Sequence, residues 1–314
     1  MFIAIAIFVA VVAVVLFAVG RLGGRRGDKI VAFAFILPAV VMLLIGLVYP
    51  ALNTLVQSFQ GPNGGNFVGL SNFTQIFTSG DERIVLRNTA MWVLLTPFIA
   101  TFIGLVYAVL IDRARVEAFA KALIFLPMAI SFVGASIIWK FVYEYRPSSG
   151  TSSQQIGLLN QVLVWLGLPS YQFLLNSPWN NIFLIIVMIW IQAGFAMTVL
   201  SASIKAIPDD IVEAARLDGL GGIGMFRYIT VPSIRPTLVV VLTTIAIGTL
   251  KTFDIVRTMT GAAFNTNIIA NEFYSQSFRA GNQGLGAALA VVLFILVIPI
   301  VVYNVRQMRA SEGR

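Results

Sequence analysis

The chain has 314 residues, of which 58% are hydrophobic and 11% are charged, and its mean hydropathy is +0.90. Soluble domains carry about 25% charged residues, so this composition excludes an aqueous globular protein. The chain contains no cysteine and no histidine, which excludes a disulfide framework and removes the usual ligands of zinc and haem. The 21 Lys and Arg against 13 Asp and Glu give a net charge of +8.

Seven apolar segments are long enough, or nearly so, to cross the ~30 Å hydrocarbon core of a bilayer as helices. They are residues 1–20, 30–51, 87–111, 118–143, 181–204, 237–257 and 284–305. No positive charge precedes the apolar run of the first segment, so it predicts a retained span rather than a cleaved signal peptide. The expected fold class is therefore an all-α integral membrane protein.

The basic residues divide the connecting segments into two groups. Segments 21–29, 112–121, 205–235 and 306–314 carry 14 Lys and Arg, whereas segments 52–87, 140–178 and 251–283 carry 7. Because cytoplasmic loops are enriched in Lys and Arg, this split predicts an N-terminus outside and a C-terminus in the cytoplasm. The same division accounts for the net positive charge, so no nucleic-acid partner is needed to explain it. Residues 156–169 are apolar but too short to span, and they predict an interfacial helix.

The longest loop of the basic group, residues 205–236, carries the signals of a helix of its own. These signals are a proline at its first position, acids in its first turn, small apolar residues three and four apart, and a final glycine: Pro208, Asp209, Asp210, Ile211, Ala214, Ala215 and Gly219. The loop therefore predicts a helix over 208–219 that presents an Ala-lined face to the cytoplasm. An isolated helix this short needs a partner to stabilise it. A second short amphipathic stretch, Met225–Ile229, precedes the next span.

The spacing in this loop resembles the EAA loop of permease subunits of binding-protein-dependent ABC importers. It is carried by Glu213-Ala214-Ala215, Gly219, Ile229 and Pro232, while Asp218 and Phe226 fit the sugar-importing members. Leu220 and Val231 depart mildly from the usual Ala and Leu. This resemblance implies a six-span permease core over residues 30–310, with residues 1–20 as an extra N-terminal transmembrane helix.

Other parts of the chain resemble the carbohydrate-uptake members of the same family, which include maltose and alpha-glucoside permeases. The matching residues are 34–38, Tyr49-Pro50, Gly69, Asn72, Phe73, Leu126-Pro127, Ser131, Trp139, Phe253-Asp254, Thr260-Gly261, Tyr274 and Gly284. After Thr260-Gly261 the family commonly has Gly-Gly-Pro, whereas this chain has Ala262, Ala263 and Phe264.

The resemblance also implies a set of partners and a coupling role for the loop. The expected partners are a second, non-identical permease, two copies of an ATP-binding cassette ATPase, an extracytoplasmic solute-binding protein and the lipid of a bacterial cytoplasmic membrane. The residues expected to couple to the ATPase are Asp210, Glu213, Ala214, Ala215, Asp218, Gly219, Phe226 and Pro232. The chain lacks a P-loop, so we expect it to bind no cofactor, and ATP–Mg²⁺ to be used by the ATPase subunits.

Polar groups inside spans usually face a cavity or a partner, so several of them are candidates for the solute pathway. Lys251, Asp254 and Arg257 are spaced three apart, on one face of an expected helix. They either line an outward cavity or form ion pairs that reach the interface. Gln192 and Asn181 either bind solute hydroxyls or link helices.

Further candidates have a packing interpretation beside the functional one. Thr198 and Ser201 are expected to link helices, Trp190, Phe195 and Tyr143 either stack on sugar rings or pack between helices, and Gly104, Gly134, Gly194 and Gly248 are expected to allow close helix contacts.

The sequence favours a transporter subunit with no enzymatic activity. The expected solute is a di- or oligosaccharide, and the alternative is another polar solute such as a glycerol phosphate or a polyol. A lipid-modifying membrane enzyme would need paired acids for a metal, but Asp81-Glu82 and Asp209-Asp210 fall on opposite predicted sides of the membrane. A secondary transporter is disfavoured because no acid lies in the middle of a span.

Overall fold

The computed structural model describes residues 10, 12–14, 17, 25–112, 115–147 and 156–312. Most of this part of the chain is helical, and its β-structure is one isolated bridge between Gln60 and Phe67. The extra span predicted over residues 1–20 lies outside the described residues, apart from the isolated positions just named.

The described helices are joined by connections that range from none to about a dozen residues or more. In chain order they are α2 (Arg25–Leu43), the π-helical turn η1 (Leu44–Val48), α3 (Tyr49–Gln57), α4 (Ser71–Thr78), α5 (Gly80–Ile111), α6 (Glu117–Phe125), the 3-10 turn η2 (Leu126–Ala129), α7 (Phe132–Val142), α8 (Leu158–Trp165), α9 (Trp179–Lys205), α10 (Asp209–Leu217), α11 (Gly222–Met225), the π-helical turn η3 (Phe226–Thr230), α12 (Val231–Lys251), α13 (Asp254–Met259), α14 (Ile269–Phe278) and α15 (Gln283–Glu312). Five of the described helical runs are long and apolar enough to cross a membrane: Phe35–Gln57, Gly80–Ile111, Trp179–Lys205, Gly222–Lys251 and Gln283–Gln307.

The span expected over 118–143 is broken rather than straight. Helices α6 and α7 are bent by 103° at the break, and they supply a sixth span only if the bent pair is counted as one. Pro127 lies in the turn η2, and Ile130 is extended with ψ 139°. Ser131 then starts the new helix, because its Oγ accepts a hydrogen bond from the backbone N–H of Gly134 at 3.1 Å.

The span expected over 237–257 is shifted toward the N-terminus. Its helical run begins at Gly222, and Pro236 lies inside α12 without ending it. The π-helical turn η3 lies directly before α12, whose second residue is Pro232. A proline ring clashes with the carbonyl four residues earlier in a regular α-helix, and the wider π-helical turn leaves room for it. The run ends at Lys251 because Thr252 is extended with ψ 124°, and its Oγ1 donates to the carbonyl of Gly248.

Helices α5 and α9 pack closely at the centre of the molecule. A Cβ added at Gly104 of α5 would lie 2.5 Å from the Cβ of Ala196 in α9. Helix α9 also approaches α6 closely, since a Cβ at Gly194 of α9 would lie 2.5 Å from the carbonyl oxygen of Ile124 in α6. The expectation of close helix contacts is therefore confirmed at these two glycines. Gly248 has ordinary spacing instead, since its nearest neighbour would be Gln192 Nε2 at 3.7 Å, and Gly134 meets only side chains of its own turn.

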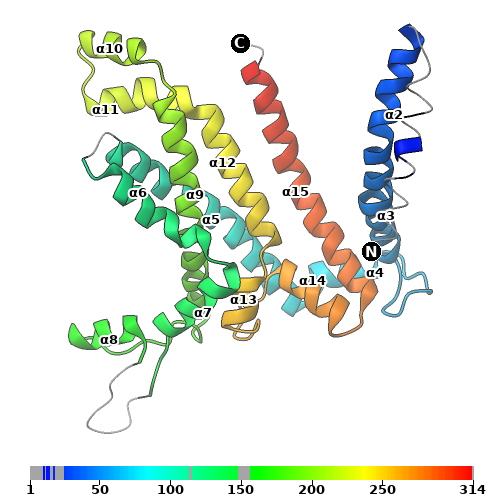
Figure 1. The fold of residues 1–314 in the computed structure, drawn as a ribbon. Helices are drawn as coiled ribbons and strands as arrows, with labels where there is room; N and C mark the ends of the chain where they lie inside the picture. The colour runs from blue at the N-terminus through cyan, green and yellow to red at the C-terminus, as the bar shows by residue number, and fades with distance from the viewer. Residues whose placement is uncertain are drawn as a thin grey trace.

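The connecting segments gather at two opposite ends of the molecule (Figure 1). Helices α10 and α11 lie at the same end as the C-terminus, whereas α7, α8, α13 and α14 lie at the other end. The helix expected within 156–169 is present as α8, and the buried amide of Asn160 anchors it by donating to the carbonyls of Glu144 and Tyr171. Helix α2 stands apart from the bundle, whereas α3 contacts α15 (Figure 1), and no residue of the most apolar stretch of Phe35–Gln57 is buried.

Candidate functional site

Helix α10 is a short, exposed helix between the spans α9 and α12. Pro208 precedes it with ψ 135°, and Asp209 and Asp210 occupy its first turn. After it, Gly219 has φ +83°, a left-handed conformation that glycine adopts without a side-chain clash. The helix predicted over 208–219 is thus present, with Pro208 as its N-cap rather than its first residue.

The exposed face of α10 differs from the expected one at one position. Ala214 is exposed, but Ala215 is 5% exposed and so does not share that face. Helix α10 packs against α11 and η3, and Ala215 lies on the packed side. A large side chain at Ala215 would therefore disrupt the packing of the loop itself, whereas one at Ala214 would project outward.

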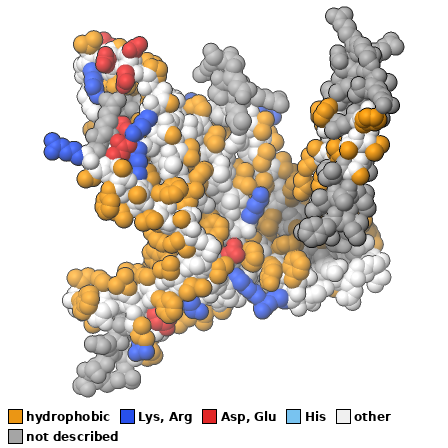
Figure 2. Space-filling model, viewed as in Figure 1, with side chains coloured by type: hydrophobic (Ala, Val, Ile, Leu, Met, Phe, Trp, Pro, Cys, Tyr) orange, Lys and Arg blue, Asp and Glu red, His pale blue; other side chains and the backbone are white. Residues whose placement is uncertain are grey.

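Acidic side chains dominate the exposed surface of α10. Figure 2 shows red Asp and Glu side chains gathered over this helix at the upper left of the molecule. The exposed residues around it are Asp209, Asp210, Glu213, Arg216, Leu217 and Asp218. Leu217 has 90% of its surface exposed, so the helix offers an apolar side chain beside a ring of carboxylates. Phe226, in η3, is half-buried, and Pro232 is exposed.

A cavity of about 420 Å³ lies between α10 and the ends of the spans α5 and α9. Its charged lining residues are Asp112, Lys205, Asp209 and Arg216. The cavity therefore separates part of α10 from the ends of the two spans.

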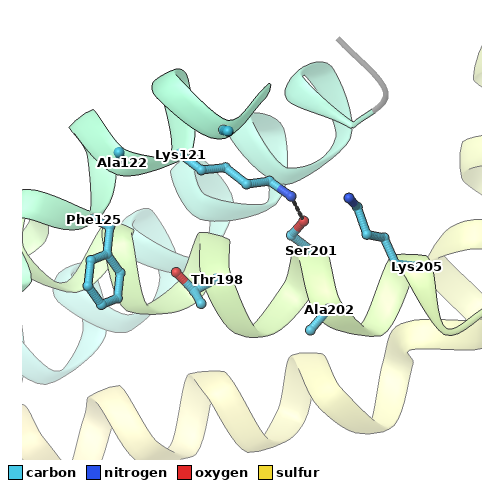
Figure 3. Close-up of a pocket in the computed structure, with 8 residues that line it drawn as sticks. Lys121, Ala122, Phe125, Thr198, Ser201, Ala202 and Lys205 are labelled. Atoms are coloured by element: carbon cyan, nitrogen blue, oxygen red, sulfur yellow. Dashed lines mark hydrogen bonds between the residues drawn. The ribbon is translucent and has the colours of Figure 1, made fainter. Parts of the chain in front are cut away.

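A second cavity, of about 450 Å³, lies between α6 and α9 (Figure 3). Lys121 spans it and donates a hydrogen bond to Ser201 Oγ. Glu117 Oε1 lies 2.6 Å from Lys121 Nζ and 2.5 Å from Lys205 Nζ. Ser201 thus links two helices as expected, whereas Thr198 donates to the carbonyl of Gly194 within α9 and links none.

The candidates for the solute pathway are only partly brought together. Gln192 of α9 lies against Gly248, one helical turn before the exposed Lys251 of α12. Asp254 is half-buried at the start of α13, beyond the break at Thr252. The expectation of one helix face carrying Lys251, Asp254 and Arg257 is therefore wrong, since the run changes helix after Lys251.

Arg257 has an aromatic partner in place of an ion-pair partner. Its guanidinium lies over the ring of Tyr274, 5.3 Å from the centroid, and the ring of Phe253 stacks on Tyr274 at 5.2 Å. No ion pair among Lys251, Asp254 and Arg257 occurs in the described part of the chain.

The aromatic candidates within the spans pack in the core. Tyr143 is 2% exposed and donates its hydroxyl to the carbonyl of Phe183 at 3.1 Å. Trp190 meets Trp139 edge-on at 5.7 Å, and both belong with Phe195 to the main apolar cluster. The packing interpretation therefore holds for these rings.

Three buried asparagines fix the turn after α13, and the sequence analysis named only Asn181 among them. Asn88 of α5 donates to the carbonyls of Asn265 and Asn267, at 2.7 and 2.9 Å. Asn180 donates to the carbonyl of Phe264, and Asn181 to that of Asn265. Asn181 is fully buried, and its Nδ2 donates within the protein, although its Oδ1 has no hydrogen-bond partner among the described residues. The sequence signal for these residues is a neutral amide in an apolar helix. Buried backbone carbonyls need a hydrogen-bond donor, and such an amide can supply it.

Comparison with known proteins decides the family. Residues 83–309 match the family described as "Binding-protein-dependent transport system inner membrane component". The chain belongs to this family. The permease is therefore an inner-membrane, multi-pass component of an ABC importer that depends on a binding protein, and it is not an enzyme.

Two relatives cover most of the permease. "Alpha-glucoside transport system permease protein AglF" of Rhizobium meliloti is 44% identical over 290 residues, which are 92% of this chain and 85% of that protein. "Osmoprotective compounds uptake permease protein GgtC" of Synechocystis is 45% identical over 278 residues, 88% of this chain and 99% of that protein. A solved bacterial ABC transporter that imports alginate covers 89% of this chain and 95% of its own, with a TM-score of 0.75 and 23% identity. That likeness shows the ABC importer permease fold.

Proposed function

We propose that this chain is one of two permease subunits of an ATP-driven sugar importer of a bacterial cytoplasmic membrane, and that α10 couples it to a cytoplasmic ATPase. The observation that carries the proposal is an acidic, solvent-exposed helix held between two spans of a chain in this family. The complete complex would contain this permease, a second non-identical permease, two ATPase subunits and an extracytoplasmic binding protein.

The coupling proposal assigns a task to each part of the loop. Asp210 and Glu213 would meet basic or hydrogen-bonding groups of the ATPase, and Ala214 would let its cleft approach the helix backbone. Gly219 would end the helix, and η3, with Phe226 and Pro232, would pass its movement to α12. Ala215 would keep the helix packed against the rest of the loop, and Asp218 would extend its acidic surface. ATP–Mg²⁺ would be bound by the ATPase. The ATP-bound ATPase would bind the outward-facing and inward-facing states of the permease with different affinities, and so would favour one of them.

A second permease subunit is supported by the unpartnered part of the fold. The span Phe35–Gln57 buries no side chain in its most apolar stretch, and it meets the rest of the chain mainly through α15. An apolar helix can face lipid without cost, but a groove of about 560 Å³ between α3 and α15 leaves imperfect packing that a partner helix would fill.

The proposed substrate is a di- or oligosaccharide. It is supported by the relative named for alpha-glucosides and by the neutral amide of Gln192, which lies against Gly248, one helical turn before Lys251. The relative named for osmoprotective compounds supports the alternative, a smaller polar solute such as a polyol or a glycerol phosphate. Lys251 and Asp254 would contact the solute hydroxyls.

The proposed orientation places α10 in the cytoplasm and α14 outside. A reporter that is active only outside the cytoplasm is expected to work when it is inserted at residues 62–66 and to fail at Gly222. The basis is the 14-to-7 division of Lys and Arg between the two groups of segments. Activity at Gly222 would contradict the orientation and, with it, the assignment of α10 to an ATPase.

The function is tested by reconstituting the permease in proteoliposomes with its partner permease, ATPase and binding protein. Binding protein loaded with maltose or trehalose is expected to stimulate ATP hydrolysis and to cause uptake of that sugar. A matched set lacking only this chain is the control. Assembly with an ATPase but uptake of a polyol, and of neither sugar, would favour the alternative solute; no association with an ATPase would refute the function.

A further inference from the structure

A polar cavity of about 270 Å³ lies at the end of the molecule opposite α10, between α3, α14 and the start of α15. It contrasts with the apolar groove between α3 and α15, because polar side chains from all three helices line it. These are Thr54 and Gln57 of α3, Ser277 of α14 and Gln283 of α15. None of the lining residues carries a charge.

Several of these polar groups are free to bind. Thr54 donates its hydroxyl to the carbonyl of Pro50, but within the described residues the side chains of Gln57, Ser277 and Gln283 have no hydrogen-bond partner. An amide offers two donors and one acceptor in a plane, so two amides and a hydroxyl can satisfy several neighbouring hydroxyls of one ligand.

Two phenylalanines complete the lining. Phe278 is 70% exposed, and the ring of Phe273 meets it edge-on at 6.2 Å. On the other side Phe278 rests on Tyr274, at 5.5 Å between centroids. An exposed ring supported from behind offers its face to the C–H groups of a ligand, as aromatic rings do where a polar ligand also has an apolar face.

The walls of the cavity are held in place by close contacts. Asn72 donates to the carbonyls of Ser58 and Gln60, directly after α3. A Cβ at Gly284 would lie 2.0 Å from the carbonyl oxygen of Gln60, and one at Gly286 would lie 2.1 Å from Ser277 Oγ. The site is therefore largely formed before a ligand arrives, which lowers the cost of binding.

We propose that this cavity is a subsite for one ring of a neutral sugar, with Phe278 stacking on the ring and Gln57, Ser277 and Gln283 binding its hydroxyls. Free amides in a lining that contains no charged residue favour an uncharged, hydroxyl-rich ligand. Its volume lies just below the range of about 300–1,000 Å³ typical of larger ligands, so it fits a single ring of a longer solute. The subsite rests on the proposed function and adds to it a place where the sugar is held after leaving the binding protein.

The test measures the sugar moved per ATP hydrolysed in the reconstituted complex, for maltose and trehalose. Phe278→Ala and Gln283→Leu are expected to lower this ratio about threefold to tenfold, the factor that one neutral hydrogen bond or a similar contact contributes. Stimulation of ATP hydrolysis by loaded binding protein is expected to stay at the wild-type level, because α10 is untouched. Phe278→Tyr keeps the ring and is expected to keep the wild-type ratio.

The controls are Phe77→Ala and Gln75→Leu, two exposed positions of the outer helix α4 away from the cavity. An unchanged ratio in the two subsite variants, with wild-type uptake intact, would overturn the subsite and leave the proposed function standing. Equal losses of uptake and ATP hydrolysis, with a lower melting temperature, would show a structural role and also overturn it. If the wild-type complex moves neither sugar, both proposals fail.

Discussion

Gly104→Ala is expected to destabilise the permease severely, although it adds a single methyl group. The new Cβ would lie 2.5 Å from the Cβ of Ala196 and 2.6 Å from the backbone nitrogen of Met197, so α5 and α9 would have to separate. Overpacking of this kind costs about 1–3 kcal/mol or more, and here the obstacle is backbone rather than a flexible side chain. The measurement is the melting temperature of the purified permease in detergent, followed by its monodisperse fraction.

Gly248→Ala is the matched control, because it makes the same substitution inside the span α12. The added Cβ would meet Gln192 Nε2 at 3.7 Å, an ordinary contact. Alanine also has a higher helix propensity than glycine by about 1 kcal/mol, so this variant is expected to be neutral or slightly stabilised. Equal melting temperatures for the two variants would contradict the close packing of α5 on α9.

Ala214→Trp is expected to abolish the stimulation of ATP hydrolysis by loaded binding protein, and uptake with it. Ala214 is exposed on α10, so the indole would project toward the proposed ATPase cleft and not into the permease. Because no span is altered, the variant is expected to insert and to melt like the wild type. The measurements are ATPase activity and sugar uptake in proteoliposomes, beside the melting temperature of the permease alone.

Ala90→Trp provides the control for size and hydrophobicity, since Ala90 is an exposed residue of α5 that lines none of the cavities described above. It is expected to keep most of the stimulation. Ala215→Trp is less informative, because Ala215 is 5% exposed and the variant would disturb the loop from within. Wild-type stimulation in Ala214→Trp would refute docking at α10.

The presence of the spans could be predicted from apolar length, but their breaks could not. The apolar run over 118–143 has the composition of one span, and the 103° bend depends on Ser131 capping a new helix after Pro127. Both residues were visible in the sequence, but hydropathy averages over them. At Thr252 the sequence holds neither glycine nor proline, so the end of α12 carries none of the usual helix-breaking signals.

The loop that carries α10 was more predictable than the proposed sugar subsite. Helix α10 has local signals at both ends, and Gly219 at φ +83° is the residue that local sterics require. By contrast, the lining of the proposed subsite joins Gln57 to Gln283 across most of the chain. No local spacing in the sequence predicts contacts between residues so far apart. The hydrogen bond from Asn88 to the turn after α13 could not be predicted for the same reason.

The contact of α3 with α15 has a consequence for the order of synthesis. Phe35–Gln57 is the first of the described spans to leave the ribosome, and its main intramolecular contact is with α15, the last. All of the chain between Gln57 and Gln283 is made in the interval, which at about 5–20 residues per second takes on the order of tens of seconds. During that time the contact of α3 with α15 cannot form, so this docking comes late in folding, and a chain truncated before α15 would lack it.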